Sequence, residues 1–218
     1  MTSVNIRHHL PEAVVAAYAA GTLPEAFSLV VASHASMCDQ CRATIQSYEA
    51  VGGAVLEQVD HATLSPDALA ATMARISLGD SATAPMPAPE RKTIFPKPLM
   101  SYVGGGPDRV KWRRVGGGVK QAILPCDGEA TARLIYIPAG AAMPDHSHRG
   151  MELTMVLQGA FSDDGDRFQR GDVEMGDDSL WHIPVADPGE DCICLAATSA
   201  PLRFKGWVPR LLQPFFRI

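Results

Sequence analysis

The stretch from Gly140 to Gly159 constrains this chain most, because it contains three side chains of types that commonly bind metals. In an extended backbone, side chains two residues apart share a face, so His146, His148 and Glu152 can point to one side of a strand. Two imidazoles and a carboxylate suit a divalent transition metal, and a fourth ligand would come from a neighbouring strand. A His-rich solvated loop is the alternative, but it leaves the regular spacing of the stretch unexplained.

The spacing resembles the first motif of the cupin family. The residues at the motif positions are Gly140, His146, His148, Glu152 and Gly159. A second cupin motif adds a histidine, and Gly171 and His182 keep its spacing. This motif departs from the usual pattern at 177–179, in place of Pro-x-Gly, and at Ala186, in place of Asn. The resemblance implies a double-stranded β-helix barrel. It also implies that the barrel holds Zn²⁺ or another divalent transition metal on His146, His148, Glu152 and His182.

Length and composition indicate an ordinary globular protein. At 218 residues, of which 46% are hydrophobic and 20% charged, the chain can bury a sizeable core in one or two domains. No apolar run approaches the length of a membrane span, and the N-terminus lacks the apolar region of a signal peptide, so we expect a cytoplasmic protein with no membrane contact. The five cysteines, two of them in Cys38-x-x-Cys41, fit a reducing compartment better than a disulfide framework.

Charge is unevenly distributed along the chain. Residues 1–78 contain three basic and seven acidic residues and carry a net charge of −4, whereas the whole chain carries −5. A basic surface on a partner protein would be attracted to this first segment. The sequence has no basic stripe and no aromatic platform, so direct binding of nucleic acid is not expected.

Four helices are expected in the first third of the chain. Pro11, Pro24 and the pair at 65–66 are typical helix starts, and Gly21 and Gly79 are typical stops. The expected helices span residues 11–21, 24–37, 39–56 and 65–79, and the third is weakened at its glycine pair, 52–53. Four short helices form only a weak core by themselves.

The motif His34-x-x-x-Cys38-x-x-Cys41 lies at the junction of the second and third expected helices. One tetrahedral zinc bound there would pin the two helices together and stabilise a small domain. A redox-active dithiol is the alternative, but the sequence lacks the preceding strand of a βαβ unit. With an N-terminal histidine one helical hairpin earlier, the motif resembles the zinc-binding anti-sigma domain. That resemblance implies the Zn²⁺ ligands His9, His34, Cys38 and Cys41, with His8 as an alternative to His9.

The second half of the chain has a different pattern. Residues 79–98 are rich in Pro, Ala and small polar residues, which predicts a linker. From residue 99, short apolar runs separated by Gly and Pro are typical of an all-β sandwich or barrel, with Cys192 and Cys194 expected as buried strand residues. The predicted fold class is α+β and multidomain: a small zinc-binding helical domain at 1–78, a linker at 79–98 and an all-β cupin barrel at 99–218.

The whole arrangement resembles the ChrR family of anti-sigma factors over nearly the full chain. The stretches that carry this resemblance include residues 19–23, 25–31 and 213–218. The resemblance implies that the N-terminal domain binds and inhibits an extracytoplasmic-function sigma factor. It also implies that the cupin domain mediates release of the sigma factor in response to singlet oxygen or related oxidants.

A metal-dependent cupin enzyme, either a dioxygenase or an isomerase, is the second interpretation. A metal centre with three histidines and one glutamate can also bind oxygen and substrate. Apart from the ligands, however, the sequence shows no evident general base, and only Arg133, Arg149 and Arg203 are left as candidate substrate anchors. Fold alone does not establish catalysis, so we expect a regulator rather than an enzyme.

Overall fold

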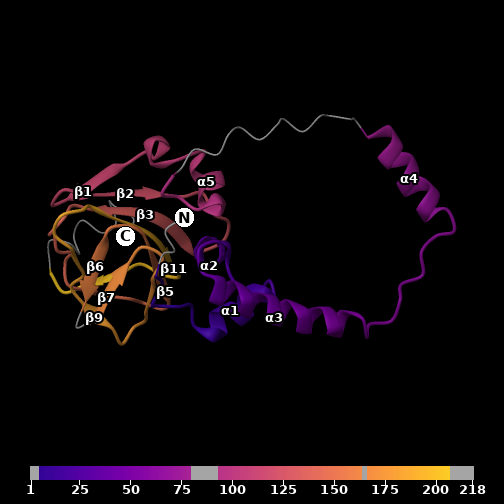
Figure 1. Ribbon diagram of the computed structural model, residues 1–218, viewed down its shortest axis with the longest axis horizontal. Coiled ribbons are helices and arrows are strands. Elements are labelled where there is room, and N and C mark those ends of the chain that lie inside the picture. The colour runs from indigo at the N-terminus through magenta and orange to yellow at the C-terminus, as the bar shows by residue number, and fades with distance from the viewer. Residues whose placement is uncertain (1–4, 80–92, 164–165, 207–218) are drawn as a thin grey trace.

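The computed structural model describes residues 5–79, 93–163 and 166–206 (Figure 1). Helices occupy the N-terminal part and strands most of the remainder, as expected. The helices are α1 (Glu12–Ala19), α2 (Glu25–Ala35), α3 (Asp39–Leu56), α4 (Ala68–Leu78), α5 (Lys97–Val103) and a 3₁₀ helix, η1 (Pro107–Arg109). The strands are β1 (Arg113–Gly116), β2 (Val119–Ile123), β3 (Thr131–Ile137), β4 (His146–Ser147), β5 (Glu152–Gln158), β6 (Ala160–Asp163), β7 (Asp166–Gln169), β8 (Val173–Gly176), β9 (Trp181–His182), β10 (Val185–Ala186), β11 (Cys192–Thr198) and β12 (Arg203–Phe204).

The first three helices begin close to where the sequence places them. α1 and α2 each follow a proline, Pro11 and Pro24, whose fixed φ suits the first turn of a helix. α3 begins after Cys38, whose Sγ accepts a hydrogen bond from the Cys41 amide at 3.4 Å and so caps the helix. α3 continues through Gly52 and its neighbouring glycine, so the expected weak point does not end the helix.

The fourth helix and the predicted linker differ from expectation at their ends. α4 begins at Ala68 rather than at the Ser-Pro pair before it. α5 begins at Lys97, inside the segment 79–98 predicted as a linker, and Leu99 and Phe95 are both buried. A proline in the first turn suits a helix start as well as a linker, so composition did not reveal α5. Residues 80–92 of the predicted linker lie outside the described residues, and the domain boundaries remain a prediction.

The strands of the described residues form three antiparallel sheets. The largest has the strand order β1-β2-β3-β11-β5-β8, and the smaller two have the orders β10-β6-β7 and β12-β4-β9. β11 pairs with β3 from Cys192, opposite Ile137, to Thr198, opposite Thr131. This register keeps inward and outward side chains aligned across the sheet. Side chains from all three sheets line one interior cavity.

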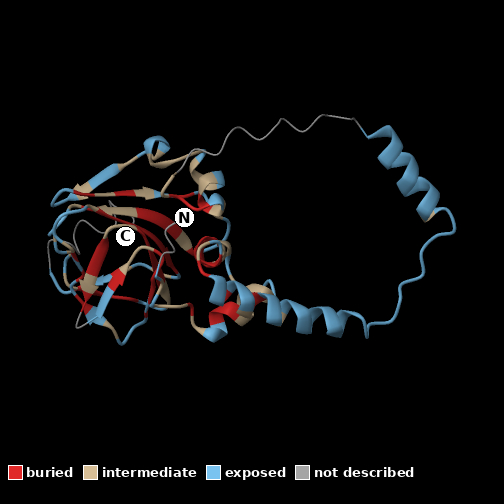
Figure 2. Ribbon diagram, in the orientation of Figure 1, coloured by how far each residue is buried: buried red, intermediate tan, exposed pale blue. Residues whose placement is uncertain are grey.

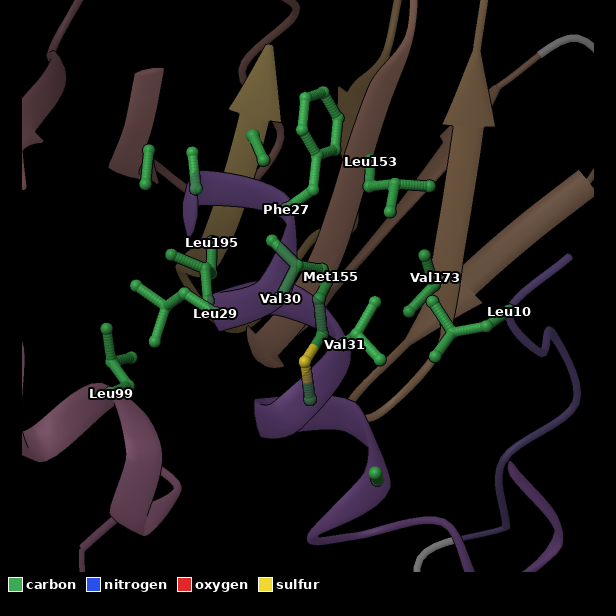
Figure 3. Packing of buried hydrophobic residues seen from close by; sticks show 14 of the residues in the cluster. Leu10, Phe27, Leu29, Val30, Val31, Leu99, Leu153, Met155, Val173 and Leu195 are labelled. Carbon is green, nitrogen blue, oxygen red and sulfur yellow. The ribbon is translucent and has the colours of Figure 1, made fainter. Parts of the chain in front are cut away.

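The centre of the large sheet is buried on both faces. Every residue of β11 is buried, which includes the two cysteines expected there. On the outer face, Leu195 belongs to one apolar cluster with Phe27 and Val30 of α2 (Figure 3). On the inner face, Cys194 and Ala196 line the cavity. The first helices and the sheet therefore share a hydrophobic core.

In contrast to α2, the distal helical segments have little contact with this core. Figure 2 shows α4 and the far half of α3 exposed, away from the sheets. No residue of α4 is buried.

Within the described part of the chain, no helix is both long and apolar enough to cross a membrane.

The segment before α1 is held on the sheet by a buried carboxylate. Asp172, which is fully buried, accepts hydrogen bonds from the backbone amides of Arg7 at 2.7 Å and His8 at 3.0 Å. The Val173 amide donates to the His8 carbonyl at 3.2 Å. The His8 ring packs on Phe168, with 4.4 Å between the ring centroids. These contacts fix the start of the helical part against β7 and β8.

We predict that Asp172→Ala lowers the free energy of unfolding by about 2–4 kcal/mol, because the partly buried amides of Arg7 and His8 lose their acceptor. Burial opposes ionisation of Asp172, but hydrogen bonds from the amides of Gln169, His8 and Arg7 outweigh it and lower the pKa of the carboxyl. Because the folded-state pKa is depressed, the ionised carboxyl stabilises the folded protein above the unfolded-state pKa of about 3.9. This stabilisation is lost as the pH falls through the folded-state pKa. Urea unfolding of wild type and variant should therefore differ at neutral pH and converge in acid. The exposed Asp60→Ala is the control, and equal losses in the two variants would contradict the prediction.

Candidate functional site

Four candidate ligands meet at the α2–α3 junction. His34 lies in the last turn of α2, and Cys38 and Cys41 lie at the start of α3. His9 approaches from the segment before α1, with its Nδ1 atom 3.3 Å from Cys38 Sγ and 3.7 Å from Cys41 Sγ. The ligand atoms of all four residues lie within 4.8 Å of one another. Two sulfur and two nitrogen donors make up a common tetrahedral zinc set.

The orientation of His34 leaves one ring nitrogen available to a metal ion. With its proton on Nδ1, the ring donates a hydrogen bond to the Gly171 carbonyl at 2.8 Å, so Nε2 carries the lone pair. That Nε2 atom is buried and has no hydrogen-bond partner in the described part of the chain. Burial lowers the pKa of His34 to about 4, so the ring is neutral at physiological pH. A buried acceptor without a donor, next to two thiols, fits a bound metal.

The structure distinguishes between the two adjacent histidines. His8 points away from the thiols: its Nε2 atom is 3.0 Å from Asp166 Oδ2, and its Nδ1 atom is 3.3 Å from Asp172 Oδ2. His9 is the one that joins the group. Burial also raises the pKa of Cys41 to about 11, so this thiol would need a nearby cation to ionise at neutral pH.

A second group of three histidines lies in the β part. His146 on β4 pairs with His182 on β9, and His148 follows β4. The Nε2 atom of His182 is 3.1 Å from that of His146 and 3.2 Å from that of His148. His146 donates from Nδ1 to the Pro144 carbonyl at 2.8 Å, and burial lowers its pKa to about 4. Three imidazole nitrogens that lie this close to one another suit a divalent cation between them.

Two buried carboxylic acids support His182 from behind. Asp163 Oδ2 is 2.7 Å from His182 Nδ1, and Glu174 Oε1 is 3.8 Å from the same atom. A carboxylate behind a ligating histidine fixes the tautomer and the direction of the ring. Burial, and then the charge of Asp163, raises the pKa of Glu174 to about 9, so the acid is protonated at neutral pH. His182 is thereby directed with Nε2 toward the other two histidines.

Glu152, predicted as a fourth ligand here, lies beside the three histidines. Its Oε2 atom is 3.3 Å from His148 Nδ1, and its Oε1 atom accepts a hydrogen bond from Thr154 at 2.9 Å. Burial raises its pKa, but the interactions with His148, His146 and Thr154 together outweigh this effect, so the net pKa is below the ordinary value. The group of mutually close ligand atoms consists of the three histidines alone. The role of Glu152 as a ligand stays a prediction.

Three residues of this region were not predicted from the sequence. Asp163 and Glu174 flank His182, and Gly176 leaves room for the His148 ring, because a Cβ atom there would lie 2.7 Å from His148 Nε2. Alternation along a strand could have placed Glu174 and Gly176 on one face. Nothing in the sequence shows which histidine that face meets.

Comparison with known proteins identifies the family. The chain is 56% identical to the anti-sigma-E factor ChrR of Cereibacter sphaeroides over 215 residues, which cover 99% of this chain and 100% of the relative. The chain belongs to the ChrR family of anti-sigma factors. Residues 103–201 match the ChrR cupin-like domain. The crystal structure of Rhodobacter sphaeroides SigE in complex with the anti-sigma ChrR matches at 54% identity and a TM-score of 0.77, covering 89% of this chain and 99% of that chain.

Membership in the ChrR family confirms the fold class expected from the sequence, with N-terminal helices and a C-terminal cupin domain. It also favours the regulator over the enzyme, because the relative that spans the whole chain is an anti-sigma factor. In this ChrR-family protein, the Cys-containing group and the three-histidine group are two separate sets of residues that could bind a metal.

We predict that His9→Gln lowers the zinc affinity of the Cys-containing group by about 100-fold, because one of four donors is lost. His8→Gln should leave that affinity nearly unchanged, because His8 contacts Asp166 and Asp172 instead. Competition with a chromophoric chelator measures both variants. An equal loss in the two would contradict the assignment of His9.

We predict that Asp163→Asn lowers the metal affinity of the three-histidine group by about 10- to 100-fold, because the charge that orients His182 is removed. Titration with Co²⁺ separates the two groups, since only the Cys-containing one gives thiolate-to-cobalt absorption. The exposed Asp178→Asn is the matched control and should bind as the wild type does. Unchanged binding to the three histidines in Asp163→Asn would exclude an orienting role for this carboxylate.

Proposed function

We propose that this protein binds an extracytoplasmic-function sigma factor through its N-terminal helices and inhibits it. The observation that carries the proposal is the exposed apolar surface of α3 and α4, in a chain that belongs to an anti-sigma family. On α4, Leu69, Met73 and Ile76 are 75%, 53% and 66% exposed, and their spacing places them on one side of the helix. A helix of this length is marginal alone in water and gains stability when a partner covers its apolar side.

A second part of the same surface lies on α3. Val51, Val55 and Leu56 are 63%, 60% and 72% exposed, whereas the buried Cys41 and Ile45 lie in the first half of the helix. Exposed apolar patches of this kind mark protein interaction sites. The net charge of −4 on residues 1–78 favours a partner with a basic surface and would speed its encounter.

The proposed role of the Cys-containing group is structural. Zn²⁺ on His9, His34, Cys38 and Cys41 would hold the α2–α3 junction and so direct α3 away from the sheets. Protein side chains would fill all four coordination positions of the ion, so no position is left open, as is usual for a structural zinc. Binding of the sigma factor would therefore depend on this ion through the direction of α3.

The proposed role of the cupin domain is to release the sigma factor in response to singlet oxygen or related oxidants. Zn²⁺ or another divalent transition metal would bind His146, His148 and His182, with Glu152 as the fourth ligand, since Glu152 lines the same cavity as His146 and His182. The proposal places the protein in the cytoplasm, where sigma factors act on RNA polymerase. The relative that matches nearly the whole chain is an anti-sigma factor, which supports a regulator over the dioxygenase or isomerase alternative.

We predict that Met73→Asp weakens binding of the sigma factor by about tenfold or more, because it places a charge in the apolar contact. The free energy of unfolding should not change, since Met73 is exposed and α4 has no buried residue. Isothermal titration with the purified sigma factor and inhibition of its transcription in vitro measure the effect. Ala71→Asp adds the same charge on the opposite side of α4 and is the matched control. Equal binding by wild type and Met73→Asp would argue against this surface.

A further inference from the structure

The cupin domain contains a cavity whose lining is mostly apolar. Its volume is about 360 Å³, which is at the small end of the range for pockets that bind small molecules. Ile135, Phe161 and Phe204 are among the apolar residues of its wall, and His146 and His182 also reach it. The cavity therefore joins the three-histidine group to a space in which a small organic molecule fits.

Arg133 lines this cavity from β3. The residue is only 5% exposed, and its buried Nε atom has no hydrogen-bond partner among the residues that the structure describes. A buried arginine commonly spreads its five N–H donors over carboxylates or carbonyls. An ionised group that is buried without such partners destabilises the folded state. Arg133 thus destabilises the folded chain unless something else in the cavity accepts its hydrogen bonds.

The nearby acidic groups do not fill that role. Burial lowers the pKa of Arg133 and the charge of Glu152 raises it, so Glu152 is close enough to act on Arg133 through space. The carboxylate of Glu152, however, is engaged with Thr154 and lies at His148. The donors of Arg133 are left for a molecule inside the cavity.

We propose that this cavity binds a small organic anion that has one carboxylate and a compact apolar body, and that Arg133 holds the carboxylate. The planar guanidinium matches a carboxylate in a two-hydrogen-bond geometry. The wall formed by Ile135, Phe161 and Phe204 would receive the apolar body. This site is distinct from the helical surface proposed to bind the sigma factor, and it does not depend on that function.

The test uses benzoate and its neutral counterpart benzamide as probes on the zinc-loaded full chain, followed by isothermal titration. Wild type should bind benzoate about tenfold or more tightly than benzamide, because only benzoate forms the charge-assisted pair. Arg133→Met should remove this preference, and Arg133→Lys should weaken it, since lysine keeps the charge but lacks the planar fork. Arg114→Met removes an exposed arginine of β1 and should bind as wild type.

Folding of the variant is checked by thermal unfolding. Arg133→Met should unfold at the same temperature as the wild type or higher, because an apolar side chain replaces a buried charge. Should it fail to fold, the wild-type comparison of the two probes and Arg133→Lys still test the site. Equal affinity for both probes, or no saturable benzoate binding to wild type, would overturn the proposal. A third outcome would also overturn the proposal: Arg133→Met keeps the preference for benzoate, and removal of the metal abolishes that preference. The carboxylate would then bind the metal and not Arg133.

Discussion

The packing of α2 against the outer face of the large sheet is the constraint on which the rest of the structure depends. The central strand β11 is buried on both sides, so its outward side chains need an apolar cover and its inward ones shape the cavity. Because α2 provides that cover, its last turn lies at a defined place beside the sheet. The junction with α3, and the Cys-containing group formed there, are positioned by the same contact. Helical and β parts are thus energetically coupled through one core rather than joined only by a chain segment.

The short strand β8 connects the two candidate metal groups most directly. Just before this strand, the Gly171 carbonyl accepts a hydrogen bond from His34, and Asp172 holds the segment that leads to His9. Along β8, Glu174 lies near His182 and Gly176 lies against the His148 ring. A shift of this strand would therefore alter contacts at both groups. The close fit of Gly176 leaves little room for such a shift without movement of His148.

Much of this arrangement could be predicted from the sequence because its signals are local. One such signal is the proline before each of α1 and α2, which predicts where the helix begins. Another is the spacing of four and three residues in the His34–Cys38–Cys41 motif, which lies within one or two helical turns. The two-residue spacing of His146 and His148 is also a local signal, although His148 follows β4 and Glu152 begins β5, so these residues do not share one strand. The contribution of Asp163 depends on pairing between distant strands, and a single acid on a strand carries no pattern. The packing of α2 on the sheet was also not predicted. An apolar helix face indicates that the face packs against another part of the protein, but it does not show which part.

The two ring nitrogens of His34 serve different parts of the molecule. Nδ1 donates to the carbonyl of Gly171, while Nε2 faces the thiols of the helical part. An ion bound at Nε2 would withdraw electron density from the ring and make Nδ1–H a better donor, so the bond to Gly171 would tighten. By thermodynamic reciprocity, a well-docked sheet would raise the affinity for that ion by the same factor. Loss of the ion and loosening of the interface between helices and sheet would consequently favour each other, even though no residue of the sheet belongs to the Cys-containing group.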